Sequence, residues 1–262
     1  MHLGFTAHFL TSGRLFEADP KAFPESASHT VREAMMGDIV QTSDSRISLN
    51  IEVAARAPIE RIEIRNGAEV LQTLRGYDAG QLANRFRVVW SGAEYRGRGR
   101  ETRWQDSVVF AGASITRFDA INAFNPERQP TQQGSDTIIF DTVTTGNFGG
   151  VDVWLQGTGL MVVTTNHGAM AVMLDDIGSE DRVLQAGGLD RNLRVFRLPE
   201  ENSTRQMRAT VDVPLQPCGD NPLWVCATTE DGFQAWSSPI YLFNSQAGPA
   251  SRGGPQKETR ND

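Results

Sequence analysis

The sequence predicts an all-β protein, built as a β-sandwich of one large or two small units, with a short helix near the N-terminus. Three observations lead to this fold class. Apolar and polar residues alternate strictly through "ISLNIEV", residues 47–53, as they do in a half-buried strand. Asn66-Gly67 separates two alternating runs, which is the strongest short signal for a β-hairpin. Further short apolar runs with regular turn signals follow, a pattern typical of β-sandwiches.

Glycine marks the other turns that we expect between strands. The apolar runs are interrupted at Ala111-Gly112, at Asn166-His167-Gly168 and at Asp231-Gly232. Glycine adopts the positive φ angles that tight turns need, so each position predicts a hairpin connection.

One short helix is predicted in "SHTVREAMMGD", residues 28–38. Thr30 and Glu33 have the spacing of a capping box, and Gly37 can end the helix in the left-handed conformation. A second helical turn is expected to start at Asp78.

We expect four segments along the chain. Residues 1–40 form a lead-in with the helix, 41–125 and 135–245 are β-rich units, and 246–262 form a disordered tail with almost no large apolar residue. The polar, proline-containing stretch 124–136 is either a long loop or a boundary between β-units. Both readings, one β-domain or two, stay open.

The charge of the chain argues against general binding to nucleic acid. The 262 residues carry a net charge of -7, whereas neutralising phosphates needs an excess of basic residues. Among the 25 basic residues only Lys21 and Lys257 are lysines. Because this bias extends over the whole chain, arginine abundance by itself does not indicate a function.

The stretch "EYRGRGRETR", residues 94–103, nevertheless stands out. Arg96, Arg98 and Arg100 alternate with glycines, and the segment 85–103 holds six arginines and two glutamates, a local charge of +4. In a strand these three arginines share one face, and Arg103 lies on the other. We expect a structural ion-pair face, an interface with another domain or an anionic ligand, or, least of all, a nucleic-acid contact. The anion or domain-interface candidates are therefore Arg96, Arg98, Arg100 and Arg103.

No catalytic or metal-binding motif emerges from the residues. The four histidines, His2, His8, His29 and His167, include no pair at HxH or HExxH spacing. "DDIGSED", residues 175–181, holds four acids but lacks the pattern of a calcium loop, so a solvated loop is the expectation. The sequence also contains no GxSxG, P-loop or GxGxxG motif.

Tryptophans and cysteines leave alternatives open. Large aromatic side chains on predicted strands fill a sandwich core or form a flat platform for sugars; they are Trp90, Tyr95, Trp104, Trp154, Trp224 and Trp236.

Cys226 lies in an apolar run and is predicted to be buried, whereas Cys218 lies in a loop. A disulfide between these two cysteines is possible but is not decided by the sequence.

No apolar run approaches the roughly 18 residues of a membrane span, and residues 1–13 lack the features of a signal peptide. We expect no membrane partner, and the compartment stays open.

Five blocks of the chain together resemble a known family. They are "VREAMMGDIVQTSD" (31–44), "APIERIEIRNG" (57–67), "RVVWSGAEYRGRGRETRW" (87–104), "TTGNFGGVDVWL" (144–155) and "DNPLWVCATTEDGFQAWSSPIYL" (220–242). They are similar, in this order, to the C-terminal part of a large group of bacterial proteins related to the PHP (polymerase and histidinol phosphatase) metal-dependent hydrolases. The resemblance covers most of residues 1–245.

The resemblance implies a β-rich accessory region that follows an N-terminal PHP-like barrel. In that family the barrel holds the divalent metals through His, Asp and Glu side chains, in an HxH motif near its start and a DxH motif near its end. This sequence contains no such barrel, so no cofactor is expected in the chain itself. His2 in "MHLGF" is a weak candidate for a remnant of the DxH segment. One imidazole does not hold a catalytic metal.

The resemblance thus leads to the expectation of a non-catalytic accessory β-region of a PHP-like hydrolase, a phosphoesterase. It would pack on or gate a catalytic domain and be inactive alone; whether the chain is itself an enzyme stays uncertain. The partner is that domain, another protein or an anionic small molecule. The alternative is a free-standing β-sandwich module that binds carbohydrate or protein, and a third reading is a fragment without function of its own.

Overall fold

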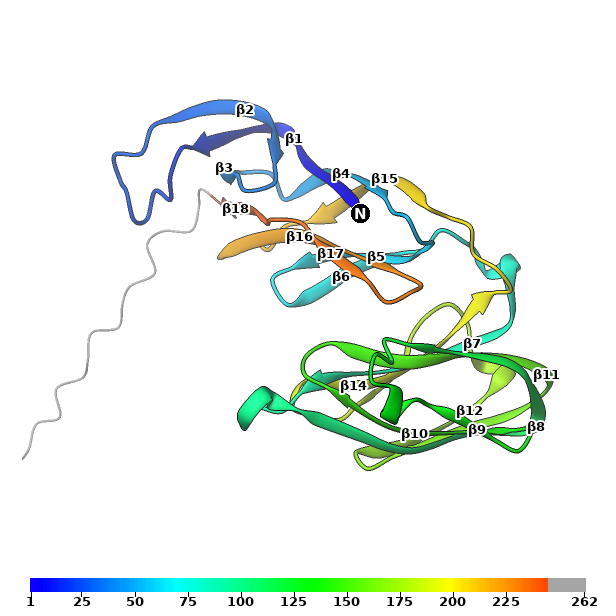
Figure 1. Cartoon of the computed structure of the whole chain (residues 1–262). Coiled ribbons are helices and arrows are strands. Elements are labelled where there is room, and N and C mark those ends of the chain that lie inside the picture. The colour runs from blue at the N-terminus through cyan, green and yellow to red at the C-terminus, as the bar shows by residue number, and fades with distance from the viewer. Residues whose placement is uncertain (245–262) are drawn as a thin grey trace, which may run out of the picture.

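The chain folds into two β-units, which the computed structural model in Figure 1 shows one above the other. The structure describes residues 1–244, except for the side chain of Arg98. The predicted tail, 246–262, lies outside the described residues. Among residues 1–244 there is no α-helix, and the helical elements are 3-10 turns of three residues each. The all-β prediction is therefore confirmed.

The first unit is a ten-stranded sheet made from both ends of the chain. Its strand order is β15-β4-β1-β3-β18-β16-β5-β6, with β2 paired to β1 and β17 paired to β16. The strands are β1 (His2–Phe16), β2 (Ser28–Met35), β3 (Ile39–Thr42), β4 (Arg46–Ala54), β5 (Ile59–Asn66), β6 (Glu69–Leu74), β15 (Gln206–Pro214), β16 (Asp220–Thr229), β17 (Gln234–Trp236) and β18 (Ile240–Asn244). Its core consists of inward apolar residues of these strands, among them Ile47, Leu49, Ile51 and Val53 of the predicted alternation.

The second unit is an eight-stranded antiparallel sheet inserted between β6 and β15. Its order is β13-β14-β7-β11-β8-β10-β9, with β12 paired to β11. The strands are β7 (Leu82–Ala93), β8 (Thr102–Ile121), β9 (Thr131–Gln133), β10 (Thr137–Thr144), β11 (Phe148–Thr165), β12 (Gly168–Met173), β13 (Arg182–Gln185) and β14 (Leu189–Pro199). A separate core, which includes Trp90 and Trp104, fills this unit.

The segment 41–125 contributes strands to both units. The stretch 124–136 joins β8 to β10 inside the second unit, and it includes the short edge strand β9. The range 41–125 contributes β4, β5 and β6 to the first unit and β7 and β8 to the second. A polar, proline-rich loop and a linker have the same composition, so the sequence did not separate them.

The predicted N-terminal helix is wrong, because residues 28–35 form strand β2. This strand pairs antiparallel with β1, and Glu33 lies opposite His8. Pairing with the exposed edge of β1 buries Ala34 and satisfies the backbone groups, which overrides the local capping signal. Gly37, with φ at 96°, forms the turn that follows instead of ending a helix.

Most of the predicted turns are confirmed. Asn66-Gly67 connects β5 to β6, and the turns at 166–167 and 231–232 follow β11 and β16. Asp78 caps a single 3-10 turn, with its carboxylate accepting a hydrogen bond from the Gly80 amide at 2.8 Å. The turn expected at Ala111-Gly112 does not exist. Gly112 instead bends the long strand β8, and a Cβ atom there would lie 2.8 Å from the Thr158 carbonyl oxygen.

Among residues 1–244 no helix combines the length and the apolar character needed to cross a bilayer.

The two cysteines form no disulfide with each other. Cys218 is exposed, Cys226 is buried, and both are free thiols.

Candidate functional site

The arginine-rich stretch forms a loop and not a strand. Strand β7 ends at Ala93 and β8 begins at Thr102, and β11 lies between these two strands in the sheet. The residues between Ala93 and Thr102 form a loop that projects from one end of the second unit (Figure 1). A 3-10 turn spans Arg98–Arg100, with positive φ angles of 111° at Gly97 and 75° at Gly99. These glycines turn the backbone where a strand would need extended angles. The prediction that Arg96, Arg98 and Arg100 share one face of a strand is therefore wrong, because these residues lie in a loop.

The four candidate arginines have different surroundings. Arg103 lies on β8 and donates to both carboxylate oxygens of Asp141 on β10, with Nε 2.7 Å from Oδ1. The side chains of Arg96 and Arg100 are exposed, and neither forms an ion pair with another described residue. Arg103 is thus held within its own sheet, while Arg96 and Arg100 stand open to solvent.

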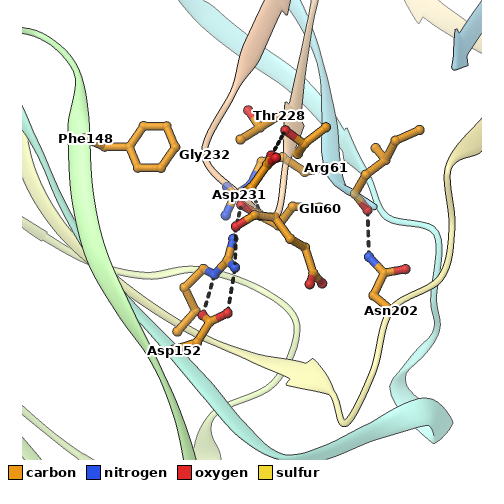
Figure 2. A network of polar contacts seen from close by, with 12 residues as sticks. Glu60, Arg61, Phe148, Asp152, Asn202, Thr228, Asp231 and Gly232 are labelled. Carbon is orange, nitrogen blue, oxygen red and sulfur yellow. Dashed lines mark hydrogen bonds and ion pairs between the residues drawn. The ribbon is translucent and has the colours of Figure 1, made fainter. Parts of the chain in front are cut away.

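The most concentrated charge chemistry lies elsewhere, at the seam between the two units (Figure 2). Arg87 of β7 donates from Nε and Nη2 to the two oxygens of Asp152 on β11, at 2.6 and 2.7 Å. Arg87 also reaches across the seam to Glu60 Oε2 of β5, at 3.3 Å. Arg85, next to it on the same face, binds Asp152 and, from the first unit, Glu230 at 2.9 Å. All of these side chains except that of Glu230 are buried.

A second part of this network surrounds Asp181, which precedes β13. Arg61 of β5 donates to Glu60 at 2.6 Å and to Asp181 at 2.7 Å. Arg75 contacts the same two carboxylates at 2.9 and 3.0 Å, and Arg194 of β14 contacts Asp181 at 3.2 Å. We call this set the seam network; it comprises Glu60, Arg61, Arg75, Arg85, Arg87, Asp152, Asp181, Arg194 and Glu230.

The seam network keeps its charged state because each carboxylate has several cationic partners. Burial alone would raise the pKa of Glu60, but the charges of Arg61, Arg87 and Arg75 hold that pKa far below its usual value. Burial would also raise the pKa of Asp181, and Arg61 and Arg194 lower it. The surrounding carboxylates raise the pKa of Arg87 against the effect of burial. The lowered pKa values of Glu60 and Asp181 are those of carboxylates in a structural ion-pair network.

Sequence reasoning missed this network, although two signals exist. Glu60 and Arg61 are adjacent charges, so one of them must lie on the inward face if this segment is a strand. Arg85 and Arg87 lie two residues apart, hence on one face of β7, among apolar residues. Buried charges need partners, so charges inside apolar runs predict ion pairs. The identity of the partners depends on the docking of two units, which the sequence does not specify.

Two clefts are lined by residues of the seam network. One, of about 430 Å³, is lined from the first unit by Trp224 and Trp236 and from the second by Gln185 and Arg194. The other, of about 460 Å³, holds exposed acids beside Trp154. The Trp154 ring lies between the guanidinium groups of Arg85 and Arg117, at 4.7 and 4.2 Å from its centroid. Both faces of this ring are therefore covered by the protein itself.

The tryptophans do not form a platform. Trp90, Trp104 and Trp154 are buried, whereas the side chain of Trp236 is 61% exposed. Trp90 stacks on Phe140 with ring centroids 4.4 Å apart, which confirms that it serves the core.

Histidines and acids do not converge on a metal site within residues 1–244, where no group of three or more ligand-type side chains is placed to hold an ion. His2 is exposed at the start of β1. Of the acids in 175–181, Asp175 and Asp176 belong to a 3-10 turn and Asp181 binds arginines.

Comparisons with protein families, with curated proteins and with solved structures find no match to this chain.

Proposed function

We propose that this chain is the non-catalytic accessory β-region of a PHP-like metal-dependent hydrolase, a phosphoesterase, and that it packs on or gates the catalytic domain. The five blocks that resemble this family support the proposal. Their place in the fold supports it further.

Four of the five blocks meet at the seam between the two β-units. The block 57–67 supplies Glu60 and Arg61, and 87–104 supplies Arg87. The block 144–155 supplies Asp152, and 220–242 supplies Glu230. The segments that carry the resemblance thus supply five of the nine residues of the seam network. This observation carries the proposal, because a pre-organised body binds a partner domain with less loss of conformational entropy.

The projecting loop between β7 and β8 is the surface that we assign to the catalytic domain. Tyr95, near the start of this loop, is 65% exposed. Arg96 and Arg100 of the same loop are exposed and form no ion pair with another described residue. Tyrosine and arginine are the residue types that dominate protein interfaces. A positive loop of this kind fits a partner surface that carries carboxylates.

The first test is enzymatic. The isolated chain is expected to show no hydrolysis of p-nitrophenyl phosphate above background with Mn²⁺ or Zn²⁺. Turnover that EDTA abolishes would overturn the proposal.

The second test is binding. The DNA upstream of this reading frame is searched for a PHP-like barrel, and that domain is purified and titrated with the chain. Replacing Tyr95 by Ala together with Arg96→Gln and Arg100→Gln is expected to weaken binding at least tenfold. The control is Arg208→Gln, an exposed arginine that pairs with Glu52 on the first unit. Equal binding by both variants would exclude this loop as the docking surface.

The alternative function, a free-standing module for carbohydrate or protein, keeps one supporting observation. Trp236 is exposed beside the seam cleft, although Trp90, Trp104 and Trp154 of the predicted platform are buried. Binding of a sugar at this place does not exclude the accessory role.

A further inference from the structure

The cleft beside the seam network has walls from both units. Its first-unit wall comes from β5, β6, β16 and β17, and its second-unit wall comes from β13, β14 and the segment 146–148. At about 430 Å³ it has the size of a small-molecule site, and such sites favour the interface between domains.

The partly exposed Arg194 faces this cleft with fewer ion-pair partners than the buried arginines Arg61, Arg85 and Arg87 have. Its guanidinium makes one ion pair, Nη1 to Asp181 Oδ2 at 3.2 Å. Asp181 already accepts shorter bonds from Arg61 at 2.7 Å and from Arg75 at 3.0 Å. The Nε atom of Arg194 is buried and has no hydrogen-bond partner among residues 1–244. An unpaired buried donor is unfavourable, so Arg194 has capacity for a further acceptor.

The other carboxylates at the cleft do not fill this capacity. Glu63 accepts two bonds from Arg65, and Asp190 accepts from the side-chain amide of Asn192. Burial lowers the pKa of Arg194, and the charge of Arg61 lowers it further. The Arg194 side chain is 21% exposed, so a ligand in the cleft can reach it.

The opposite wall offers a ring surface and amides. The Trp236 side chain is largely exposed, whereas the Trp224 ring is covered by Arg65, whose guanidinium carbon lies 5.3 Å from its centroid. Gln185, Gln234 and Asn147 place amide groups around the same cleft. Amides donate and accept hydrogen bonds, as the hydroxyl groups of a sugar also do.

We propose that this cleft binds a small anionic ligand with a hydroxylated ring, a sugar carboxylate, whose carboxylate meets Arg194 and whose ring lies against Trp236. The inference concerns the seam and is independent of the docking loop and of the proposed accessory role. The ligand's carboxylate pairs with the part of the Arg194 guanidinium that is open to the cleft, which has Asp181 as its one ion-pair partner among the described residues. The amides bind the ring hydroxyls.

The test is calorimetric titration of the full chain with D-glucuronate, D-glucose and acetate at constant ionic strength. Glucuronate is expected to bind, glucose to bind at least tenfold more weakly without the charge-assisted bond, and acetate to bind more weakly without the ring. Arg194→Gln is expected to weaken glucuronate binding at least tenfold, and Trp236→Ala to weaken both sugars.

A matched control lies on the same strand. Arg197 also has a buried Nε without a partner among the described residues, but it binds Asn84 and lies over Phe86, away from the cleft. Arg197→Gln is expected to leave glucuronate binding unchanged. Since Trp236 is a surface residue, its variant tests the site even if Arg194→Gln unfolds. No binding of glucuronate, equal binding of glucose, or equal binding of acetate would overturn the assignment.

Discussion

Arg87 and Asp152 lie directly opposite each other on the paired strands β7 and β11, and their side chains form two parallel hydrogen bonds of 2.6 and 2.7 Å. Both side chains are buried. The same guanidinium reaches Glu60 and the Glu230 backbone carbonyl of the first unit. A cross-strand pair inside one unit therefore also holds the second unit to the first.

Removing the Asp152 charge is expected to destabilise the protein strongly. Asp152→Asn leaves Arg85 and Arg87 in the seam with one carboxylate fewer, and an uncompensated buried charge costs about 3–5 kcal/mol. Urea denaturation followed by tryptophan fluorescence measures the loss. The matched control is Asp141→Asn, which removes the exposed partner of Arg103 and should cost no more than about 1 kcal/mol. If both variants lose the same free energy of unfolding, the seam network is not a stabilising element.

The pH dependence of stability should report the same carboxylates. In the folded protein the charges of Arg61, Arg87 and Arg75 overcome the effect of burial, so the pKa of Glu60 lies far below its usual value of 4.5. A depressed pKa in the folded state stabilises the protein above the usual pKa, and this stability is lost as the pH falls. We expect the free energy of unfolding to decline steadily as the pH is lowered from 5 to 3.

Glu60→Gln separates this contribution from that of the other acids. The variant should be less stable than the native protein at pH 7, and its stability should fall less steeply between pH 5 and 3. An unchanged slope would assign the acid sensitivity to other groups, of which Asp181 is the first candidate because its pKa is lowered as well.

The sequence predicted the fold class and most hairpins because these depend on local signals. The alternation in 47–53 and the pair Asn66-Gly67 act over a few residues, and the structure contains both. The helix predicted at 28–38 is wrong because a contact with a distant part of the chain overrides its local signals. Its capping residues are local, but the edge of β1 that competes with them is supplied by another part of the fold.

The candidate site was less predictable because its parts come together only through the insertion of one unit into the other. Glu60 and Asp181 are far apart in the sequence, and both bind Arg61. The arginine loop was conspicuous in the sequence because its charges are neighbours along the chain. Its conformation depends on Gly97 and Gly99, whose φ angles are positive. The two-residue spacing of the arginines is also that of one face of a strand, so it led to the wrong prediction.

The open arginines of the loop should contribute nothing to folding. Arg96→Gln and Arg100→Gln together are expected to change the free energy of unfolding by less than about 0.5 kcal/mol, as surface substitutions usually do. Urea denaturation of the double variant checks this. Arg191→Gln provides the comparison, since Arg191 pairs with Glu94 and donates to the Ala186 carbonyl oxygen at 2.7 Å. A loss above about 1 kcal/mol in the double variant would show that Arg96 or Arg100 has a structural partner.

The two free thiols should differ sharply in reactivity. Cys218 is exposed, whereas Cys226 is buried in β16, and burial raises the pKa of Cys226 to about 11. The thiolate is the reactive form, and at pH 8 roughly one Cys226 side chain in a thousand is ionised. Iodoacetamide at pH 8 is therefore expected to label Cys218 within minutes and Cys226 only after unfolding in urea, as read by peptide mass spectrometry. In Cys218→Ser the native protein should remain unlabelled over the same time. Rapid labelling of Cys226 in that variant would mean that the seam around β16 opens in solution.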